Sequence, residues 1–212
     1  MRSVIALVLL TATAHAGHEV SIGDSVRALR TSSANALTDD DLFGGTLGYA
    51  YLVGRDLIPH LELWAHGTFA WAGADGEMFR TLDTEIDTLA FTAGGGVRYE
   101  LHPRVAALAR LEIGMLRGAV SLRDDSGHSA SDHGWGAMTS ASVGIDLYAI
   151  RRSRFSLGLR FELAAVATSS IPLTATPDAS DDDTLHLEMS PASLGSLNLS
   201  GPSFGFSLVG QL

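Results

Sequence analysis

Three short motifs in the sequence place an arginine two residues before a glutamate. They are Arg98-Tyr99-Glu100, Arg110-Leu111-Glu112 and Arg160-Phe161-Glu162. Residues two apart in a β-strand project from the same face, so each motif presents a cation beside a carboxylate. Such a pair can pack as an ion pair, carry protons along a narrow pore, or serve as an acid–base pair in an enzyme. The spacing predicts the shared face and leaves the chemistry open.

Further titratable residues fall on the same faces of the expected strands. Glu62, His66 and Asp146 join the three motifs as candidate lumen residues. Because an unpaired buried charge is costly, the favoured interpretation is a packed salt-bridge network that seals the interior. A gated pore or proton path is the alternative, and an enzymatic carboxylate pair is the least favoured.

Glu62, His66 and Thr68 on one expected strand also have the residue types of a hydrolase triad. Nothing in the sequence identifies an oxyanion hole to accompany them. We therefore predict no catalytic residues and expect that the protein is not an enzyme, with an outer-membrane lipid-modifying enzyme as a minor alternative.

Acidic runs raise the question of a metal site, because Ca²⁺ and Mg²⁺ prefer oxygen ligands. The candidates are Asp39–Asp41 and the run Asp181, Asp182, Asp183, with Asp178 and Glu188 nearby. Neither run follows an EF-hand spacing, so solvated acidic loops are favoured, and no metal or cofactor is predicted. The alternative is that divalent cations bridge these acids to anionic lipopolysaccharide.

The elements that would position these residues are β-strands, because apolar and polar residues alternate along much of the chain. Residues 89–101 alternate most clearly, with a small, Gly-rich polar face that suits a crowded lumen better than a solvated surface. The expected strands are 42–53, 60–72, 89–101, 105–115, 137–148, 155–165 and 203–212.

One more strand is needed for an even number. Residues 18–30 alternate, but their pattern puts Asp24 on the apolar face, and a bulge near Gly23 could correct the phase. If this segment is not a strand, Thr184–Met189 must supply the eighth one.

The connections alternate in length and charge. The short ones, near 54–59, 102–103 and 150–153, are rich in Arg, whereas the long ones span 31–41, 73–87, 117–134 and 168–201. The long connections hold 16 of the 24 acidic residues. Short turns on one side and long polar loops on the other are typical of outer-membrane barrels.

Composition agrees with a membrane barrel. The 14 basic residues are all Arg and face 24 acidic ones, for a formal charge of −10, which argues against nucleic-acid binding. Apolar residues make up 46% and charged residues 18%. After residue 16 no apolar run is long enough for a membrane helix. An exported soluble β-sandwich or lipocalin-like barrel is the alternative, and an all-β, eight-stranded antiparallel up-and-down transmembrane β-barrel is predicted.

The first sixteen residues have the layout of a secretory signal peptide. Arg2 precedes the apolar run Val4–Leu10, and Ala14-His15-Ala16 offers a cleavage site. We therefore expect a signal peptide over 1–16, a barrel domain over 17–212, and export to the periplasm of a Gram-negative bacterium.

The chain resembles the small eight-stranded outer-membrane barrels, the superfamily of the OmpA, OmpX and OmpW transmembrane domains. The resemblance rests on the hairpin Gly94–Arg104 and the alternating C-terminal strand. It implies a monomer in the outer membrane, in contact with its lipids and lipopolysaccharide and inserted by the assembly machinery. The last residue, Leu212, departs from the aromatic residue usual in the family. The implied role is structural or surface-interacting, with a narrow passive channel for ions or small solutes as the alternative.

Overall fold

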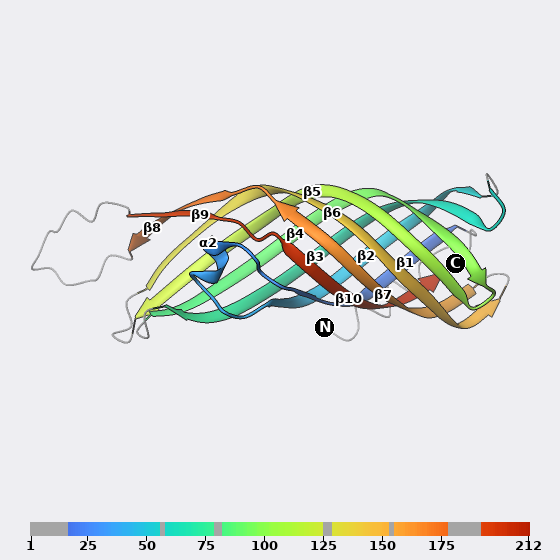
Figure 1. Cartoon of the computed structure of the whole chain (residues 1–212), viewed down its shortest axis with the longest axis horizontal. Coiled ribbons are helices and arrows are strands. Elements are labelled where there is room, and N and C mark those ends of the chain that lie inside the picture. The colour runs from blue at the N-terminus through green and yellow to red at the C-terminus, as the bar shows by residue number, and fades with distance from the viewer. Residues whose placement is uncertain (1–16, 56–57, 79–81, 125–128, 153–154, 178–191) are drawn as a thin grey trace, which may run out of the picture.

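The computed structural model describes residues 17–55, 58–78, 82–124, 129–152, 155–177 and 192–212. Within these residues, eight antiparallel strands close into a ring in the order β1-β2-β3-β4-β5-β6-β7-β10 (Figure 1). The prediction of an all-β, eight-stranded, antiparallel up-and-down barrel is confirmed. The elements are β1 (His18–Arg27), α2 (Ser32–Asn35), β2 (Leu42–Arg55), β3 (Leu61–Met78), β4 (Leu82–His102), β5 (Val105–Asp124), β6 (Ser129–Arg152), β7 (Phe155–Thr168), β8 (Ile171–Pro177), β9 (Ala192–Leu197) and β10 (Gly201–Gln211).

The barrel is closed with a regular stagger. A path that starts at Arg27 and steps from each residue to its partner on the next strand, through β10 first and β2 last, returns to β1 at Gly17. Gly17 is ten residues before Arg27, so the strands are staggered by ten residues around the ring. A stagger of this kind requires strands tilted by about 35–45° to the barrel axis. Because the ring is closed, each barrel strand is hydrogen-bonded on both sides over its paired length, and the exposed-edge problem of an open sheet does not arise.

Three strands contain a bulge just before they turn, at the end of the barrel where the C-terminus lies. The register shifts at Leu52/Gly54, at Glu100/His102 and at Tyr148/Ile150, in each case on the strand that runs down into a tight turn. A bulge increases the local twist, which lets a long strand end in a short reversal. The strand that follows the first of these turns begins after His60, whose positive φ of 68° is unusual for a residue with a side chain.

Two of the four predicted long loops are wrong. Most of 73–87 and 117–134 belongs to strands, because β3 and β4 stay paired up to Met78 and Leu82, and β5 and β6 up to Arg123 and Ser129. The alternation that predicts strands continues here, but the polar residues move to the other face. The 31–41 connection contains α2. The 168–201 connection contains β8 and β9, which pair with each other, while β8 also joins β6.

The first barrel strand is β1, so residues 18–27 supply the eighth strand. The predicted bulge near Gly23 is wrong, since β1 pairs continuously with both neighbours from Glu19 to Arg27. Asp24 consequently lies exposed on the outer face, opposite Gly45 and Phe206. The alternative strand at 184–189, and the expected signal peptide at 1–16, lie outside the described residues.

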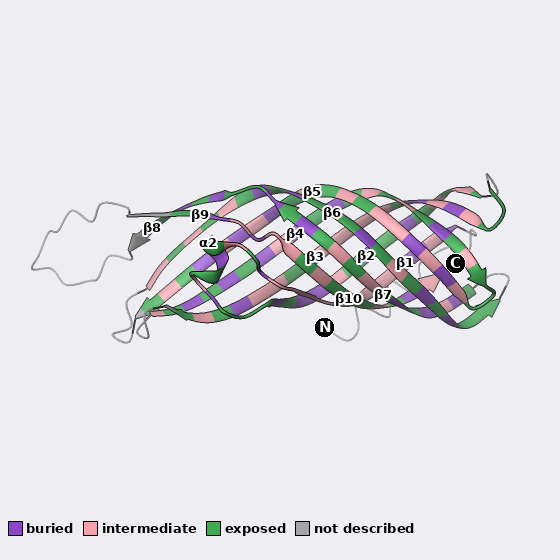
Figure 2. Cartoon of the chain, viewed as in Figure 1, coloured by how far each residue is buried: buried purple, intermediate pink, exposed green. Residues whose placement is uncertain are grey.

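The two halves of the barrel lumen are filled by different kinds of side chain. Near the end that carries α2, β8 and β9 (Figure 1), buried apolar side chains fill the lumen, and toward the other end charged side chains do so. Figure 2 shows that buried residues occur along both halves of the barrel. The largest fully buried apolar residues are Leu42, Ile86, Leu116, Val120, Ile171, Leu197 and Leu199 in the outer half, together with Val209 lower down. Loop residues such as Leu199 therefore fold into the lumen and cover the end of this apolar core.

Candidate functional site: a charge network in the lumen

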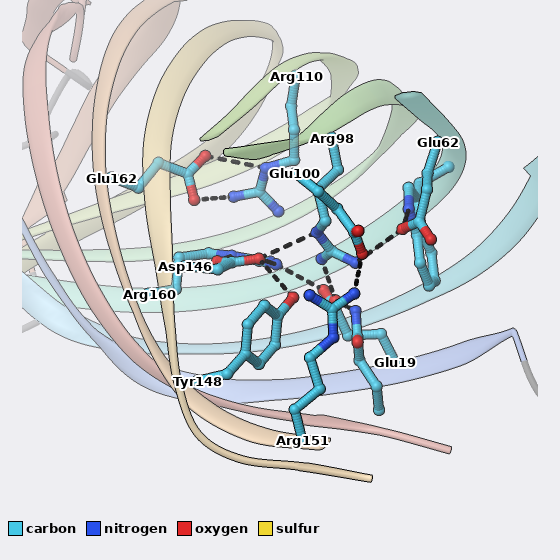
Figure 3. A network of polar contacts seen from close by, with 12 residues as sticks. Glu19, Glu62, Arg98, Glu100, Arg110, Asp146, Tyr148, Arg151, Arg160 and Glu162 are labelled. Carbon is cyan, nitrogen blue, oxygen red and sulfur yellow. Dashed lines mark hydrogen bonds and ion pairs between the residues drawn. The ribbon is translucent and has the colours of Figure 1, made fainter. Parts of the chain in front are cut away.

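The centre of the charged half is a closed ring of four ion pairs. Arg160 contacts Asp146 through Nε–Oδ1 at 2.7 Å and Nη2–Oδ2 at 2.9 Å, and contacts Glu19 through Nη2–Oε1 at 2.9 Å. Arg98 contacts Asp146 through Nε–Oδ2 at 3.0 Å and also pairs with Glu19 through Nη2. The four residues come from β7, β6, β4 and β1, and all four are at least 97% buried. The ring therefore crosses the lumen (Figure 3).

Two neutral side chains complete the hydrogen bonding of the ring carboxylates. The Tyr148 hydroxyl donates to Asp146 Oδ2 at 3.2 Å, and Gln211 Nε2 donates to Glu19 Oε2 at 3.0 Å. A buried carboxylate is costly unless its oxygens are occupied, so these donors stabilise the charged form of the ring.

Glu62 links the ring to the wall of the barrel. Its carboxylate lies 3.0 Å from Arg55 Nη2 and 3.7 Å from Arg98 Nη1, and accepts a hydrogen bond from Trp64 Nε1 at 3.1 Å. The Arg98 guanidinium also sits 4.6 Å from the Trp64 ring centre, within cation–π range. Trp64 is itself buried in the lumen.

A second layer lies above the ring, toward the apolar core. Arg110 Nε donates to Glu162 Oε1 at 2.9 Å, and Nη2 of the same guanidinium contacts the other carboxylate oxygen. Glu112 accepts hydrogen bonds from Thr68 at 3.0 Å and Thr92 at 3.1 Å, and lies 3.9 Å from Arg110 Nη1. These side chains come from β3, β4, β5 and β7, so this layer also spans the lumen.

Glu100 lies at the lower mouth, where it pairs with Arg151 from β6 (Figure 3). Arg151 also donates to the Pro103 carbonyl oxygen at 3.0 Å. Both side chains of the pair are nearly 30% exposed, so solvent screens this contact more than the contacts of the ring.

The predicted residues thus gather in one lumen, but with partners that the motifs do not indicate. Within the three motifs, all of whose residues are described, only Arg110 and Glu112 approach each other, at 3.9 Å. Arg98 and Arg160 both reach Glu19 instead. Neighbours on one strand face project in parallel, whereas a long Arg side chain can cross a narrow barrel to a strand on another wall.

The network residues that sequence reasoning missed are Glu19, Arg55, Trp64, Thr92, Tyr148, Arg151 and Gln211. Glu19 had a readable signal, because Glu19, Ser21, Gly23, Ser25 and Arg27 form an unbroken polar face. Assuming a bulge at Gly23 concealed it. Trp64, Thr92, Tyr148 and Gln211 do fall on the inward faces that the alternation predicts, but they are neutral and were not counted as partners of the charges. Arg55 and Arg151 lie in the predicted short connections, where the alternation ends.

The structure shows no hydrolase arrangement at the suggested triad. Thr68 donates to Glu112 and Glu62 is held by Arg55 and Trp64, so neither contacts His66. His66 faces the lumen, where its Nε2 lies 2.9 Å from the position that a Cβ on Gly96 would take.

The segment Gly201–Gly205 matches the Gly-x-Ser-x-Gly pattern of a nucleophile elbow. That motif needs its serine on a sharp turn between a strand and a helix. Ser203 instead lies within β10, and its hydroxyl donates to the Val26 carbonyl oxygen at 3.1 Å. The match is therefore a feature of a Gly-rich barrel strand.

No group of three or more His, Asp or Glu residues suited to a metal occurs within the described ranges. Asp39–Asp41 are exposed. Asp181, Asp182 and Asp183 lie outside the described residues.

A helix of sufficient length and apolar character to span a membrane is absent from the part of the chain that the structure describes. The chain matches no protein-family profile, and no curated protein matches it.

Solved barrels resemble it at low sequence identity. Ail, the attachment invasion locus protein of Yersinia pestis, solved in complex with the heparin analogue sucrose octasulfate, is 15% identical, with a TM-score of 0.49 over 92% of this chain and 97% of Ail. The translocator domain of the autotransporter NalP from Neisseria meningitidis is 11% identical, with a TM-score of 0.38 over 100% of this chain and 93% of NalP.

Proposed function

We propose that the protein is an outer-membrane β-barrel of structural or surface-interaction type, not an enzyme, with its lumen closed by the charge network. One observation carries the membrane assignment, namely the reversal of polarity along β4. From Leu89 to Leu101 the outward residues are apolar or aromatic and the inward ones include Arg98 and Glu100. Above Leu89 the order inverts.

In the upper part of β4, Asp83, Glu85 and Asp87 point outward and are exposed, while Thr84 and Ile86 point inward and are buried. An outward charge belongs in water and an outward apolar row belongs in lipid. The inversion therefore supports a membrane boundary between Leu89 and Asp87, which sequence analysis missed by treating 73–87 as a loop.

The height of the apolar row supports the same assignment. Twelve steps from Leu89 to Leu101, at about 3.3 Å each and a tilt of about 45°, span about 28 Å along the barrel axis. The apolar band of a bacterial outer-membrane barrel is about 25 Å tall. Trp71 and Tyr99, at opposite ends of the band, are both exposed, as interface aromatics should be.

The filling of the lumen supports a closed barrel. The four-membered ring, the Arg110–Glu162 layer and the outer apolar core lie one above another, each built from several strands. Every carboxylate of the two charged layers is held by a cation or by hydroxyl donors, which is typical of packing rather than of an acid–base catalyst.

Three partner assignments belong to the same proposal. The apolar band would contact membrane lipids, and the acidic outer face above it would meet lipopolysaccharide, with divalent cations as bridges. The assembly machinery would insert the chain, and the closed ring leaves no barrel edge that needs a second copy, which supports a monomer.

The decisive experiment is planar-bilayer recording on the refolded barrel, combined with heat modifiability on gels. We expect a heat-sensitive shift in mobility and no steady conductance. A variant that removes the ring cations, Arg98→Ala with Arg160→Ala, should be less stable because Glu19 and Asp146 lose their counter-ions, and it should still not conduct, since the Arg110–Glu162 layer and the apolar core remain. Steady conductance by the unmodified chain would favour the narrow passive channel, and recovery of that chain as a soluble periplasmic species would refute the membrane assignment.

A further inference from the structure

Arg27 differs from the other arginines of the lumen. It projects inward from the upper end of β1, where its strand neighbours are Leu42 and Ser203. Its Nε and Nη1 atoms are buried and have no hydrogen-bond partner, and no residue in the described ranges forms an ion pair with it. Asp24, the acid nearest in sequence, points to the outer face.

The remaining lumen arginines show what Arg27 lacks. Arg98, Arg110 and Arg160 each have at least one carboxylate oxygen within 3.0 Å. A guanidinium is always charged, so it cannot escape the cost of burial by losing its proton. Arg27 is half-buried as a whole, but two of its guanidinium nitrogens are buried without a protein partner, which points to a counter-ion from outside the chain.

Arg27 lines a cavity of about 110 Å³ between the apolar core and the four-membered ring. The hydroxyls of Ser25 and Ser140 also line it, and neither makes a hydrogen bond within the described part of the chain. The upper wall includes Met138 and Val166, and Arg160 lies at the lower end. The cavity is large enough for a small ion with a few water molecules.

Three carboxylates line this cavity; two of them are already engaged, and the third, Asp24, is exposed on the outer face of β1. Glu162 is held by two nitrogens of Arg110, and Glu112 by two threonine hydroxyls and a longer contact with Arg110. Glu112 belongs to β5, four strands from β1 in the ring of eight, so it starts from the opposite wall to Arg27. Neither carboxylate neutralises Arg27 by contact.

We propose that this cavity binds one small monovalent anion of the halide class, with Arg27 as its counter-ion and the Ser25 and Ser140 hydroxyls as donors. The Arg27 guanidinium, which no carboxylate in the described ranges contacts, matches one negative charge. The apolar core lies above this cavity and the four-membered ring below it, so a bound anion would be part of the packing of the folded lumen.

The test compares urea unfolding of the mature chain, refolded and equilibrated in chloride or in gluconate at equal ionic strength. Gluconate is too large for the cavity. One bound anion should raise the folding equilibrium constant up to tenfold for each tenfold rise in chloride above its Kd. Arg27→Gln should abolish the dependence, whereas Arg30→Gln, at an exposed arginine three residues further on, should keep it.

Two further measurements guard against a failed variant or an indirect effect. Crystals of the unmodified protein grown in bromide should show anomalous scattering beside Arg27. Glu112→Gln should retain or strengthen the chloride dependence if an anion is bound, because it removes a repelling charge. Chloride and gluconate giving the same stability in the unmodified protein, or bromide bound elsewhere only, would overturn the proposal and leave Arg27 solvated by water and balanced at a distance by Glu112.

Discussion

The pair Arg110–Glu162 offers the sharpest test of the lumen network, because its geometry allows a magnitude to be worked out. Two guanidinium nitrogens meet two carboxylate oxygens, and the two side chains are only 14% and 12% exposed. Removing one partner of such a buried pair costs about 3–5 kcal/mol, because the other charge stays buried alone. Removing both charges together costs less than the sum of the two single changes.

We therefore expect a double-mutant cycle to show strong coupling. Arg110→Met and Glu162→Gln keep the approximate shape of each side chain and remove its charge. Each single change should lower the free energy of unfolding by about 3 kcal/mol, and the double change by about 3 kcal/mol in total, a coupling of about 3 kcal/mol. Urea titration of the barrel in phospholipid vesicles, followed by tryptophan fluorescence, measures all four species.

Two comparison cycles make this expectation specific. Arg110 with Glu112, the pairing that the sequence motif suggests, should couple by less, because those charges lie 3.9 Å apart. The mouth pair Arg151–Glu100, nearly 30% exposed on both sides, should couple by about 1 kcal/mol or less. Additive costs for Arg110 and Glu162, or equal coupling in all three cycles, would show that the network is not held as described.

The remaining predictions concern the two faces of the wall. Leu111→Arg, on the lipid-facing row of β5, should cost about 2–4 kcal/mol in vesicles, while Ser121→Arg, outward on the same strand above the boundary, should be nearly neutral in the same titration. Asp24→Val should stabilise the barrel in vesicles by about 1 kcal/mol, because it removes a carboxylate from that row; a loss of stability would reveal a partner for Asp24. Ile86→Asp should unfold the outer half, seen as lost amide protection there, because it buries a lone carboxylate in the apolar core. The Asp132 carboxylate accepts backbone N–H groups from β8 and from its own strand, which lowers its pKa below the ordinary value. The contact should therefore be fully present above the ordinary pKa and weaken as pH falls through the lowered one, which a smaller protection factor at the β8 amide, corrected for the intrinsic exchange rate at each pH, would show.

Period-two alternation was sufficient to predict the architecture, because in a membrane barrel every strand has one lipid face and one lumen face. It located the strands and the inward position of Arg98, Arg110 and Arg160. It failed at β1, where Asp24 on the outer face suggested a bulge that the structure does not contain. A carboxylate is tolerated near the edge of the apolar band. Asp24 therefore does point outward, and the alternation along β1 continues without a shift.

The upper halves of β3 and β4 could not be assigned in the same way. Alternation continues past Leu89, but Asp87 replaces an apolar residue outside and Ile86 replaces a polar one inside. A pattern that requires apolar residues outside and polar residues inside along the whole strand predicts that the strand ends at this point. The ion-pair partners were equally hidden, because which Arg reaches which carboxylate depends on the ten-residue stagger of the ring, and no local spacing encodes that stagger.

Charges rather than apolar side chains fill the lower lumen for a reason that goes beyond stability. An ion-pair ring of this depth gives little net stability over a packed apolar core, since desolvation offsets most of the Coulomb attraction. In the membrane, however, an apolar lumen would leave both faces of each strand alike, and nothing would define the inward side. With Arg98, Asp146 and Arg160 in place, a slip of one residue in any of their strands turns a charge outward into lipid. The network therefore selects one strand register among several that would have similar backbone hydrogen bonds. The apolar core above the network lies in the part of the barrel that water surrounds, so it supplies hydrophobic stabilisation that the membrane-embedded half cannot obtain from its own interior.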